Sequence, residues 1–312
     1  MSTEAVANGF KMHGVARSGF DAGGGSGLYD RARPTYPIEA ITTILRESQP
    51  ATGAPLRLVE LGAGTGIASR MLLSQATTPS SDGTPPVGIA SFQAIEPSAG
   101  MRSAFEKNIS SLETGLVGEL KRKGQLAPNA EVTVDEGTFE EFDAGTERDL
   151  VVIAQAFHWC SDFDLALTKA AGTLRKGGIL ALIWNLEDRE AAPWVAKLRD
   201  IYEMHEDGTP QYRHNYWHSM YTTASYGDFF TADAPRHFSR ALPTTLEGVK
   251  DRMKSKSYIS VLSASEQTQL DEQVENLFRS LSDEELGRRW IDKDQGVWEY
   301  PYKTDLFLFR KK

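Results

Sequence analysis

A glycine-rich turn between a predicted strand and a predicted helix is the feature that most constrains this chain. The stretch "LVELGAGTGIASRMLL" (residues 58–73) begins with apolar strand formers, continues through three glycines and ends in a helical apolar pattern. Glycines at such a turn let the chain bend sharply and let a ligand approach the backbone. An acid, Glu60, precedes the glycines. A ligand of this turn should therefore carry positive charge rather than phosphate.

The spacing of Gly62, Gly64 and Gly66 argues against two phosphate-binding motifs. The dinucleotide fingerprint is Gly-x-Gly-x-x-Gly, but Ile67 stands at its third glycine position. A P-loop ends in Gly-Lys-Ser or Gly-Lys-Thr, and "GAGTGIAS" contains no lysine. A nicotinamide-dependent oxidoreductase is thus only an alternative. The structural alternative is a helix-capping glycine turn with a solvated Glu60.

A nucleoside that carries positive charge fits the turn better. S-adenosylmethionine has a sulfonium and an ammonium group, and Glu60 would attract both. Glu96 ends the next predicted strand in "FQAIEPSAGM", where a carboxylate can accept hydrogen bonds from both ribose hydroxyls. An isolated glutamate at a strand end is often merely exposed, but its place after the glycine turn favours the ribose role.

Composition excludes several classes of function. The 312 residues are 40% hydrophobic and 25% charged, which suits one large or two modest domains. A net charge of -9 provides no basic field, so we expect no nucleic-acid partner. One cysteine, Cys160, rules out an intrachain disulfide and fits a reducing compartment. With no signal-like or membrane-spanning apolar run, we expect a cytoplasmic protein with no membrane partner.

Apolar patterns along the chain predict alternating strands and helices. The predicted strands cover residues 56–61, 89–96, 131–137, 149–156 and 178–184. Such alternation predicts an α/β fold with a parallel sheet covered by helices on both faces. We expect a flexible tail over residues 1–28, a core over residues 29–186, a helical cap subdomain over residues 187–295 with a strand near 236–242, and a last core strand within residues 296–312.

Several motifs together resemble class I S-adenosylmethionine-dependent methyltransferases. The resemblance is to the small-molecule branch that includes trans-aconitate methyltransferase and related fungal enzymes. It rests on "YDRARPTYP", "VELGAGTG", "AIEPSAGM", "GTFEEFD", "AQAFHWCSDFD" and "LRKGGILALIWN", and more weakly on "KSKSYI" and "YPYKTDLFLF". It implies a Rossmann-like, seven-stranded, mainly parallel sheet with an antiparallel last strand over residues 304–310, and a helical cap. S-adenosylmethionine is the implied cofactor.

The resemblance also assigns cofactor contacts residue by residue. In addition to Glu60, it implies that Gly62 and Gly64 contact the methionyl part and that Glu96 contacts the ribose. Pro97 and Met101 would contact one face of adenine, and Thr138 and Phe139 would contact the adenine edge. Gln155 would lie by the sulfonium region, and Tyr29 and Arg33 would close over the cofactor. Thr138 stands where many relatives have an acid that accepts a hydrogen bond from the adenine amino group. A hydroxyl could still accept that bond.

Methyl transfer requires alignment and exclusion of water more than a fixed set of catalytic groups. His158 and Trp159 follow Gln155 at the end of the fourth strand, where ligands collect in open α/β sheets. His158 could be a general base, an orienting contact or a structural residue. Cys160 has no matching histidine and acid, so we expect a passive thiol.

The stretch "QYRHNYWHSMYTTASYGDFF" could be an aromatic lid, an ordinary core or a subunit contact. Arg213, Tyr216 and Trp217 are its candidate substrate-binding residues. His214 and His218 have helical metal-pair spacing, but no acid completes the set, so we expect no metal.

We favour a carboxylate acceptor over a hydroxyl or an amine of a natural product. A carboxylate is already ionised and needs no base, and Arg31, Arg33 or Arg213 could anchor it. The alternative is an inactive S-adenosylmethionine-binding sensor or partner subunit. We expect a monomer or a homodimer.

Overall fold

The structure is a computed structural model that describes residues 25–79, 83 and 85–312. The chain divides into two compact units. The sheet unit comprises residues 35–184, 210–236 and 305–312, and the helical unit comprises residues 25–34, 185–209 and 237–304 of the described chain. Most of the predicted tail, residues 1–24, lies outside the described residues. Helix α2 (Gly25–Ala32) begins four residues before Tyr29, where we expected order to start.

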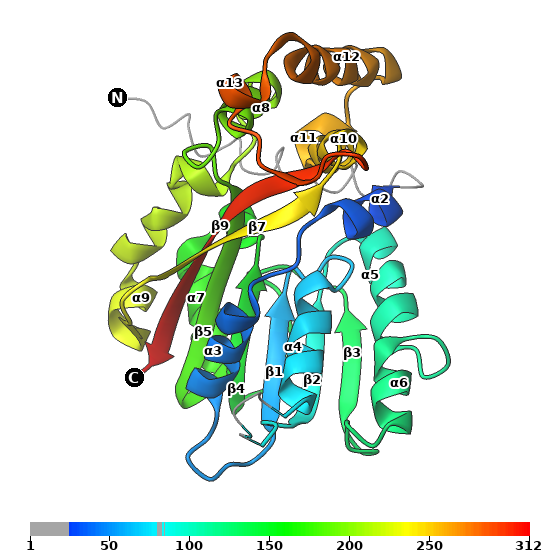
Figure 1. The fold of residues 1–312 in the computed structure, drawn as a ribbon. Coiled ribbons are helices and arrows are strands. Elements are labelled where there is room, and N and C mark those ends of the chain that lie inside the picture. Colours follow the sequence, from blue (N-terminus) through cyan, green and yellow to red (C-terminus); the bar gives the residue numbers. More distant parts are fainter. Residues whose placement is uncertain (1–24, 80–82, 84) are drawn as a thin grey trace, which may run out of the picture. The chain divides into compact units, whose positions relative to one another are not determined.

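Within the described residues, a nine-stranded sheet has the order β3-β2-β1-β4-β5-β9-β6, with β7 and β8 also pairing with β9 (Figure 1). The first five strands in this order pair in parallel. They are β1 (Leu56–Leu61), β2 (Ile89–Ile95), β3 (Glu131–Asp135), β4 (Arg148–Ala154) and β5 (Leu174–Glu187). The last strand is antiparallel to its partners β6 and β8. The predicted α/β fold, a mainly parallel sheet with an antiparallel last strand, is confirmed.

The strand number and the length of the last strand differ from the prediction. The remaining strands are β6 (Phe230–Ala232), β7 (Arg236–Thr244), β8 (Trp290–Asp292) and β9 (Val297–Lys311). Strands β6 and β8 have three residues each, too few to show an alternating pattern. Strand β9 runs through Pro301, which lacks a donor and reads in sequence as a break. In the described part of the chain the sheet therefore has nine strands, two more than expected.

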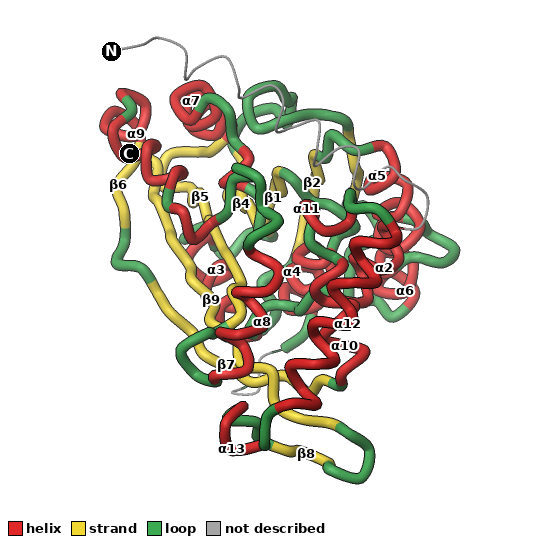
Figure 2. The backbone as a smooth tube through the Cα atoms, turned by 90° about the horizontal axis from the view of Figure 1, so that it is seen from above, coloured by secondary structure: helices red, strands yellow, loops and turns green. Residues whose placement is uncertain are grey.

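Helices cover both faces of the sheet in the sheet unit. They are α3 (Ile38–Ser48), α4 (Ile67–Thr77), α5 (Ala99–Phe105), the π-helical η1 (Glu106–Ser110), α6 (Leu116–Arg122), α7 (Phe163–Thr173), α9 (Ala224–Phe229) and the 3-10 turns η2 (Phe157–Trp159), η3 (Tyr212–His214) and η4 (Tyr216–Thr222). Figures 1 and 2 show α3 and α4 on one face and α7 on the other. Helix α3 buries Ile41, Ile44 and Leu45 at helical spacing.

The helical unit has a core of its own. Besides α2, it contains α8 (Pro193–Glu203), α10 (Leu246–Lys254), α11 (Ser257–Ser260), α12 (Ala264–Ser280) and α13 (Asp283–Leu286). Trp194 is fully buried there, with ring centroids 4.6 Å from Tyr300 and 5.4 Å from Phe278. None of the helices in the described parts of the chain is both long and apolar enough to cross a membrane.

The division of the chain differs from the expected one at several segments. Residues 210–236, expected in the cap, group with the sheet unit, whereas residues 29–34 and 296–304, expected with the core, group with the helical unit. The first difference has a clear cause. The ring centroid of Trp184 in β5 lies 4.6 Å from that of Tyr212 and 4.7 Å from that of Trp217. Residues 210–236, which we call the aromatic segment, therefore complete the core of the sheet unit.

The tightest position in the glycine turn is Gly66, with φ of 89°. A Cβ there would lie 2.7 Å from Ile109 Cγ1 and 3.0 Å from Phe105 Cδ2. We expect Gly66→Ala to lower the free energy of unfolding by about 2–5 kcal/mol, from left-handed strain of ~1–2 kcal/mol and overpacking of ~1–3 kcal/mol. Urea denaturation measures this loss.

Gly53→Ala is the matched control, because Gly53 has φ of 70° but a Cβ on it would meet no heavy atom within 4 Å. It should lose only the conformational part, about 1–2 kcal/mol. Equal losses at the two positions would contradict tight packing around the turn.

Candidate active site

The glycine turn follows β1 and is fixed to the end of β2. Gly62, Gly64 and Gly66 all have positive φ, at 70°, 57° and 89°. The amides of Gly62 and Ala63 donate to the Ile95 carbonyl at 2.8 and 3.2 Å. Residues other than glycine rarely adopt this backbone conformation, so the predicted turn requires its glycines.

Gly62 and Gly64 have different surroundings. A Cβ on Gly62 would lie 2.8 Å from Ala156 Cβ and 3.5 Å from the Phe139 ring, whereas a Cβ on Gly64 would meet no heavy atom within 4 Å. Gly62 thus packs where the segments after β3 and β4 meet the turn. Gly64 leaves open space beside its backbone.

Glu96 connects this turn to the start of α5. Its carboxylate is buried and accepts from the Gly64 amide at 2.8 Å through Oε2 and from the Ser98 amide at 2.9 Å through Oε1. The Ser98 hydroxyl in turn caps α5 by accepting from the Met101 amide. Pro97 is half-buried and Met101 is buried. The structure therefore brings together the predicted ribose and adenine residues.

Glu60 lies within β1 and is 1% exposed, so the alternative of a solvated Glu60 is wrong. Burial and the nearby charge of Glu96 raise the pKa of Glu60 to about 8, although the Ser69 hydroxyl donates to its carboxylate. The side chain is therefore largely protonated at neutral pH. A cation placed near it would favour its ionised form.

Gln155, directly after β4, is a non-glycine residue with φ of 56°. Its amide donates to the Ile183 carbonyl at 2.8 Å, which fixes it to β5. Such a conformation costs of order 1–3 kcal/mol and is found mostly where a functional site requires it. This strain is a site signal that the sequence pattern does not carry.

His158 lies in η2 beside the half-buried Trp159, with ring centroids 5.4 Å apart. The Trp184 indole N–H donates to His158 Nδ1 at 3.2 Å. A neutral imidazole that accepts at Nδ1 carries its proton on Nε2. His158 Nε2 is therefore a donor in this tautomer, which suits an orienting contact better than a general base.

Glu140 is a buried acid that our sequence reasoning did not single out, although it lies in the motif "GTFEEFD". Its Oε1 accepts from the Ser161 amide and hydroxyl at 2.9 and 2.8 Å and from the Asp162 amide at 3.2 Å. Burial alone would raise the pKa of Glu140, but these hydrogen bonds hold it below its ordinary value. Glu140 thus fixes the segment that follows η2.

Three further predicted residues lie around this segment. The Thr138 hydroxyl accepts from the Glu140 and Glu141 amides at 3.3 and 3.0 Å. Phe139 is buried edge-on to Phe157, with ring centroids 5.8 Å apart. Burial and the charge of Glu140 raise the pKa of the Cys160 thiol, so it stays protonated and unreactive.

The aromatic segment needs a correction at Trp217, which we expected to bind substrate. Trp217 is fully buried in the stack with Trp184 and Tyr212, and the Tyr212 hydroxyl donates to Asp305 at 2.6 Å. The Trp217 indole has no exposed face, so Trp217 is a core residue. Tyr216 is 63% exposed and Arg213 is half-buried.

His214 and His218 do not share one helix, because Asn215 between them is left-handed, with φ of 59°. Over the described ranges, no group of three or more potential metal ligands is found.

Tyr29 and Arg33 belong to the helical unit. The Arg33 guanidinium lies 4.7 Å from the centroid of the Tyr29 ring and donates from Nη2 to the Ser255 carbonyl at 2.8 Å. Their predicted place over the cofactor stays a prediction.

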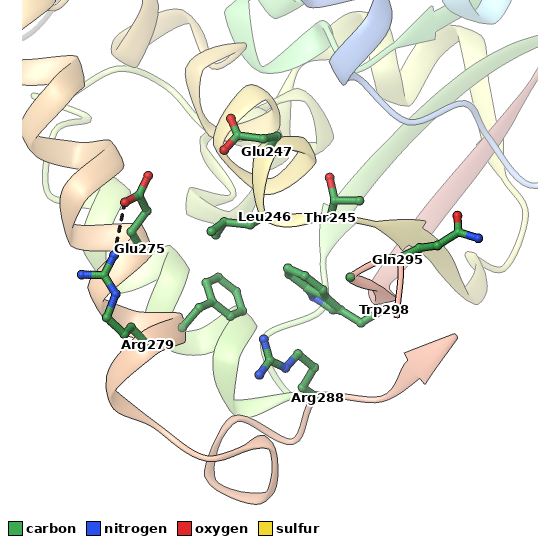
Figure 3. Close-up of a pocket in the computed structure, with 10 residues that line it drawn as sticks. Thr245, Leu246, Glu247, Glu275, Arg279, Arg288, Gln295 and Trp298 are labelled. Atoms are coloured by element: carbon green, nitrogen blue, oxygen red, sulfur yellow. Dashed lines mark ion pairs between the residues drawn. The ribbon is translucent and has the colours of Figure 1, made fainter. Parts of the chain in front are cut away.

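The helical unit also contains an open groove of about 450 Å³ (Figure 3). It is lined by Thr245, Leu246, Glu247, Glu275, Phe278, Arg279, Arg288, Gln295, Gly296 and Trp298. Its charges are paired within the protein, since Lys250 and Arg279 contact Glu275 and Asp283 binds Arg288. None of the predicted site residues lines this groove.

Comparison with known proteins places a recognisable domain around the turn. Residues 59–182 match a family described as a methyltransferase domain. An uncharacterized methyltransferase of Mycobacterium tuberculosis is 31% identical over 192 residues, 60% of each chain. The match thus spans about 60% of the length of this mycobacterial relative. An uncharacterized methyltransferase of Schizosaccharomyces pombe is 26% identical over 262 residues, 81% of this chain and 85% of the relative.

A solved structure from Anaeromyxobacter dehalogenans, assigned as a type II methyltransferase, has a TM-score of 0.55. It is 16% identical and the match covers 89% of this chain and 97% of the other. This likeness concerns the fold. The trans-aconitate methyltransferase branch stays a prediction. Residues 59–182, built around the glycine turn of a mainly parallel sheet, are thus similar to a methyltransferase domain.

Proposed function

We propose that this protein is an S-adenosylmethionine-dependent methyltransferase that acts on a small molecule, with a carboxylate favoured as the methyl acceptor. One observation carries the proposal. The turn at Gly64 leaves open space beside its backbone, and the same amide is held by the buried carboxylate of Glu96. Close backbone approach next to an acid suits a nucleoside ligand better than a phosphate.

The residues around the turn fit this cofactor. A carboxylate offers about four acceptor sites, so Glu96 can bind ribose hydroxyls in addition to the two amides it accepts. Pro97 and Met101 would contact adenine. The Thr138 oxygen already accepts two amides, so its O–H would donate to a ring nitrogen of adenine instead of accepting from the amino group.

Glu60, Gly62 and the strained Gln155 would contact the methionyl part of the cofactor. When bound, S-adenosylmethionine supplies a methyl group activated by its sulfonium. Glu60 would ionise beside the positive charge, and Gly62 and Gln155 would border the methionyl chain. Burial of these groups would exclude water and keep the reacting atoms aligned.

His158 would orient the acceptor. Its Nε2–H can donate to an oxygen of a carboxylate, which is ionised at neutral pH because its reference pKa is about 4. No proton needs to be removed from such an acceptor. Arg213, which is half-buried, would anchor its charge.

Incubation with methyl-labelled S-adenosylmethionine and panels of carboxylic acids, phenols and amines tests the proposal. Methyl esters release labelled methanol in alkali, whereas aryl methyl ethers and methylamines do not. We expect alkali-labile label from a carboxylic acid. Tight cofactor binding with no transfer to any panel would favour the inactive sensor, and stable label would identify a phenol or an amine.

Glu96→Gln tests the ribose contact, because it keeps the shape and one acceptor oxygen but removes the charge. We expect the affinity for S-adenosylhomocysteine to fall by about 10- to 150-fold, equivalent to about 1.5–3 kcal/mol for charged hydrogen bonds. Calorimetry measures it. Glu136→Gln is the control, since Glu136 is an exposed acid that pairs with Arg102. An unchanged affinity in a folded Glu96→Gln protein would refute the ribose role.

Glu60 should couple cofactor binding to proton release. Its pKa of about 8 leaves it mostly protonated at pH 7, and a bound cation lowers that pKa. We therefore expect S-adenosylmethionine to release close to one proton from this site at pH 7 and less as the pH rises above 8. Calorimetry in buffers of different ionisation enthalpy measures the release. Glu60→Gln should abolish it, and persistence of the release in that variant would place the proton elsewhere.

His158→Gln should keep most of the maximal rate and mainly raise KM for a carboxylate, because the side chain orients an acceptor that is already ionised. Initial-rate kinetics on the acid identified above measures the split, with the exposed His218→Gln as the control. A loss of about a hundredfold or more in maximal rate, recovered at high pH, would instead identify His158 as a general base.

A further inference from the structure

The helical unit contains a largely buried group of cations around Ser255. We call it the cation cluster: Arg33, Arg252 and Lys256, with Glu187 as their carboxylate partner. Arg252 Nη2 and Lys256 Nζ both contact Glu187 Oε1, at 2.7 and 2.9 Å. Arg252, Lys256 and Glu187 are 3%, 8% and 2% exposed. Two cations therefore share one buried carboxylate, and the half-buried Arg33 is the third cation of the cluster.

Ser255 holds two of these cations next to each other. Its carbonyl accepts from Arg33 Nη2 at 2.8 Å and its hydroxyl accepts from Arg252 Nη1 at 3.2 Å. Lys256 is the next residue, and its ammonium also lies 4.3 Å from the centroid of the Tyr202 ring. Among the described residues, Arg33 makes no ion pair of its own.

Several donors of the cluster have no acceptor. Within the described chain, Arg33 Nε and Arg252 Nε are buried and without a hydrogen-bond partner, and so are the hydroxyls of Tyr202 and Tyr300. Buried donors of this kind are nearly always satisfied in native proteins. Burial and the charge of Arg252 lower the pKa of Lys256 to about 7 and also lower the pKa of Arg33. The cluster therefore has fewer negative charges than cations and too few acceptor oxygens for its donors.

We propose that the cation cluster is a binding site for the carboxylate of a small molecule. A carboxylate would bring one negative charge and acceptor oxygens for the unpaired Nε–H groups of Arg33 and Arg252. The hydroxyls of Tyr202 and Tyr300 can also donate to it. The groove of Figure 3 is a weaker candidate, since its charges are already paired and its lining leaves open one neutral donor, Trp298 Nε1.

Two molecules of the proposed reaction could supply this carboxylate: the acceptor and the methionyl part of the cofactor. Assignment to either rests on the proposed function, whereas carboxylate binding itself does not. Binding measurements without methyl transfer therefore test the site even where no acceptor is known. They also separate its failure from a failure of the proposed function, which the Glu96 variant reports.

The test variant is Lys256→Met, which removes one cation and leaves Glu187 paired with Arg252. Lys250→Met is the matched control, because Lys250 lies in the same unit and pairs with Glu275 at 2.9 Å. Arg33→Met is a second variant that breaks no ion pair. Thermal unfolding of the free proteins verifies that each variant folds.

Calorimetry with citrate, succinate and neutral dimethyl succinate forms the first arm. We expect the two acids to bind the original protein and the Lys250→Met control, with affinity reduced at least tenfold in Lys256→Met and Arg33→Met, and no binding of the ester. This result assigns the site to an acceptor carboxylate.

S-adenosylhomocysteine and 5′-methylthioadenosine, which lacks the amino-acid part, form the second arm. A tenfold or greater loss for the first ligand alone in Lys256→Met assigns the site to the cofactor carboxylate. If both variants bind all of these ligands as the original protein does, or if the ester binds as well as the acid, the cation cluster is not a carboxylate site and the proposal is overturned.

Discussion

The hydrogen bond from the Gly64 amide to the Glu96 carboxylate joins the two strand ends on which the candidate active site is built. A buried carboxylate is costly unless it is hydrogen-bonded, so Glu96 depends on the turn to present this amide. The turn presents it only because Gly62, Gly64 and Gly66 hold left-handed conformations. Packing at Gly62 and Gly66 leaves the backbone little freedom, while open space at Gly64 is where a ligand can enter.

Local patterns predicted the part of the fold that carries this turn, and long-range contacts decided the rest. Strand β1 (Leu56–Leu61) begins and ends where its mostly apolar run does, because burial on both faces of a parallel sheet leaves a largely hydrophobic signal, interrupted here only by Arg57 and Glu60. Trp217 gave no such signal. It belongs to the core only because Trp184, more than thirty residues earlier, lies against it. Residue type and spacing alone are the same for an aromatic lid and for a core.

The site could be predicted in its positions but not in its protonation states. Glu60 and Glu96 are recognisable from their places at the ends of strands, yet the pKa of Glu60 depends on burial and on Glu96 nearby, which only the folded chain reveals. The tautomer of His158 depends likewise on an indole N–H from the neighbouring strand β5. Glu140 acts through backbone amides that follow it by some twenty residues, and no spacing rule predicts such a contact.

The two units treat buried charge in opposite ways, and the difference bears on function. In the sheet unit, Glu60 avoids the cost of a buried charge by keeping its proton, and Glu96 accepts two amides. In the helical unit, Arg252 and Lys256 remain on Glu187 beside Arg33, and the open guanidinium donors are not compensated. Replacing buried charges by apolar residues is often neutral or stabilising. Stability alone therefore gives no reason for a cluster of three cations with a single carboxylate partner, whereas a ligand that supplies the missing charge does.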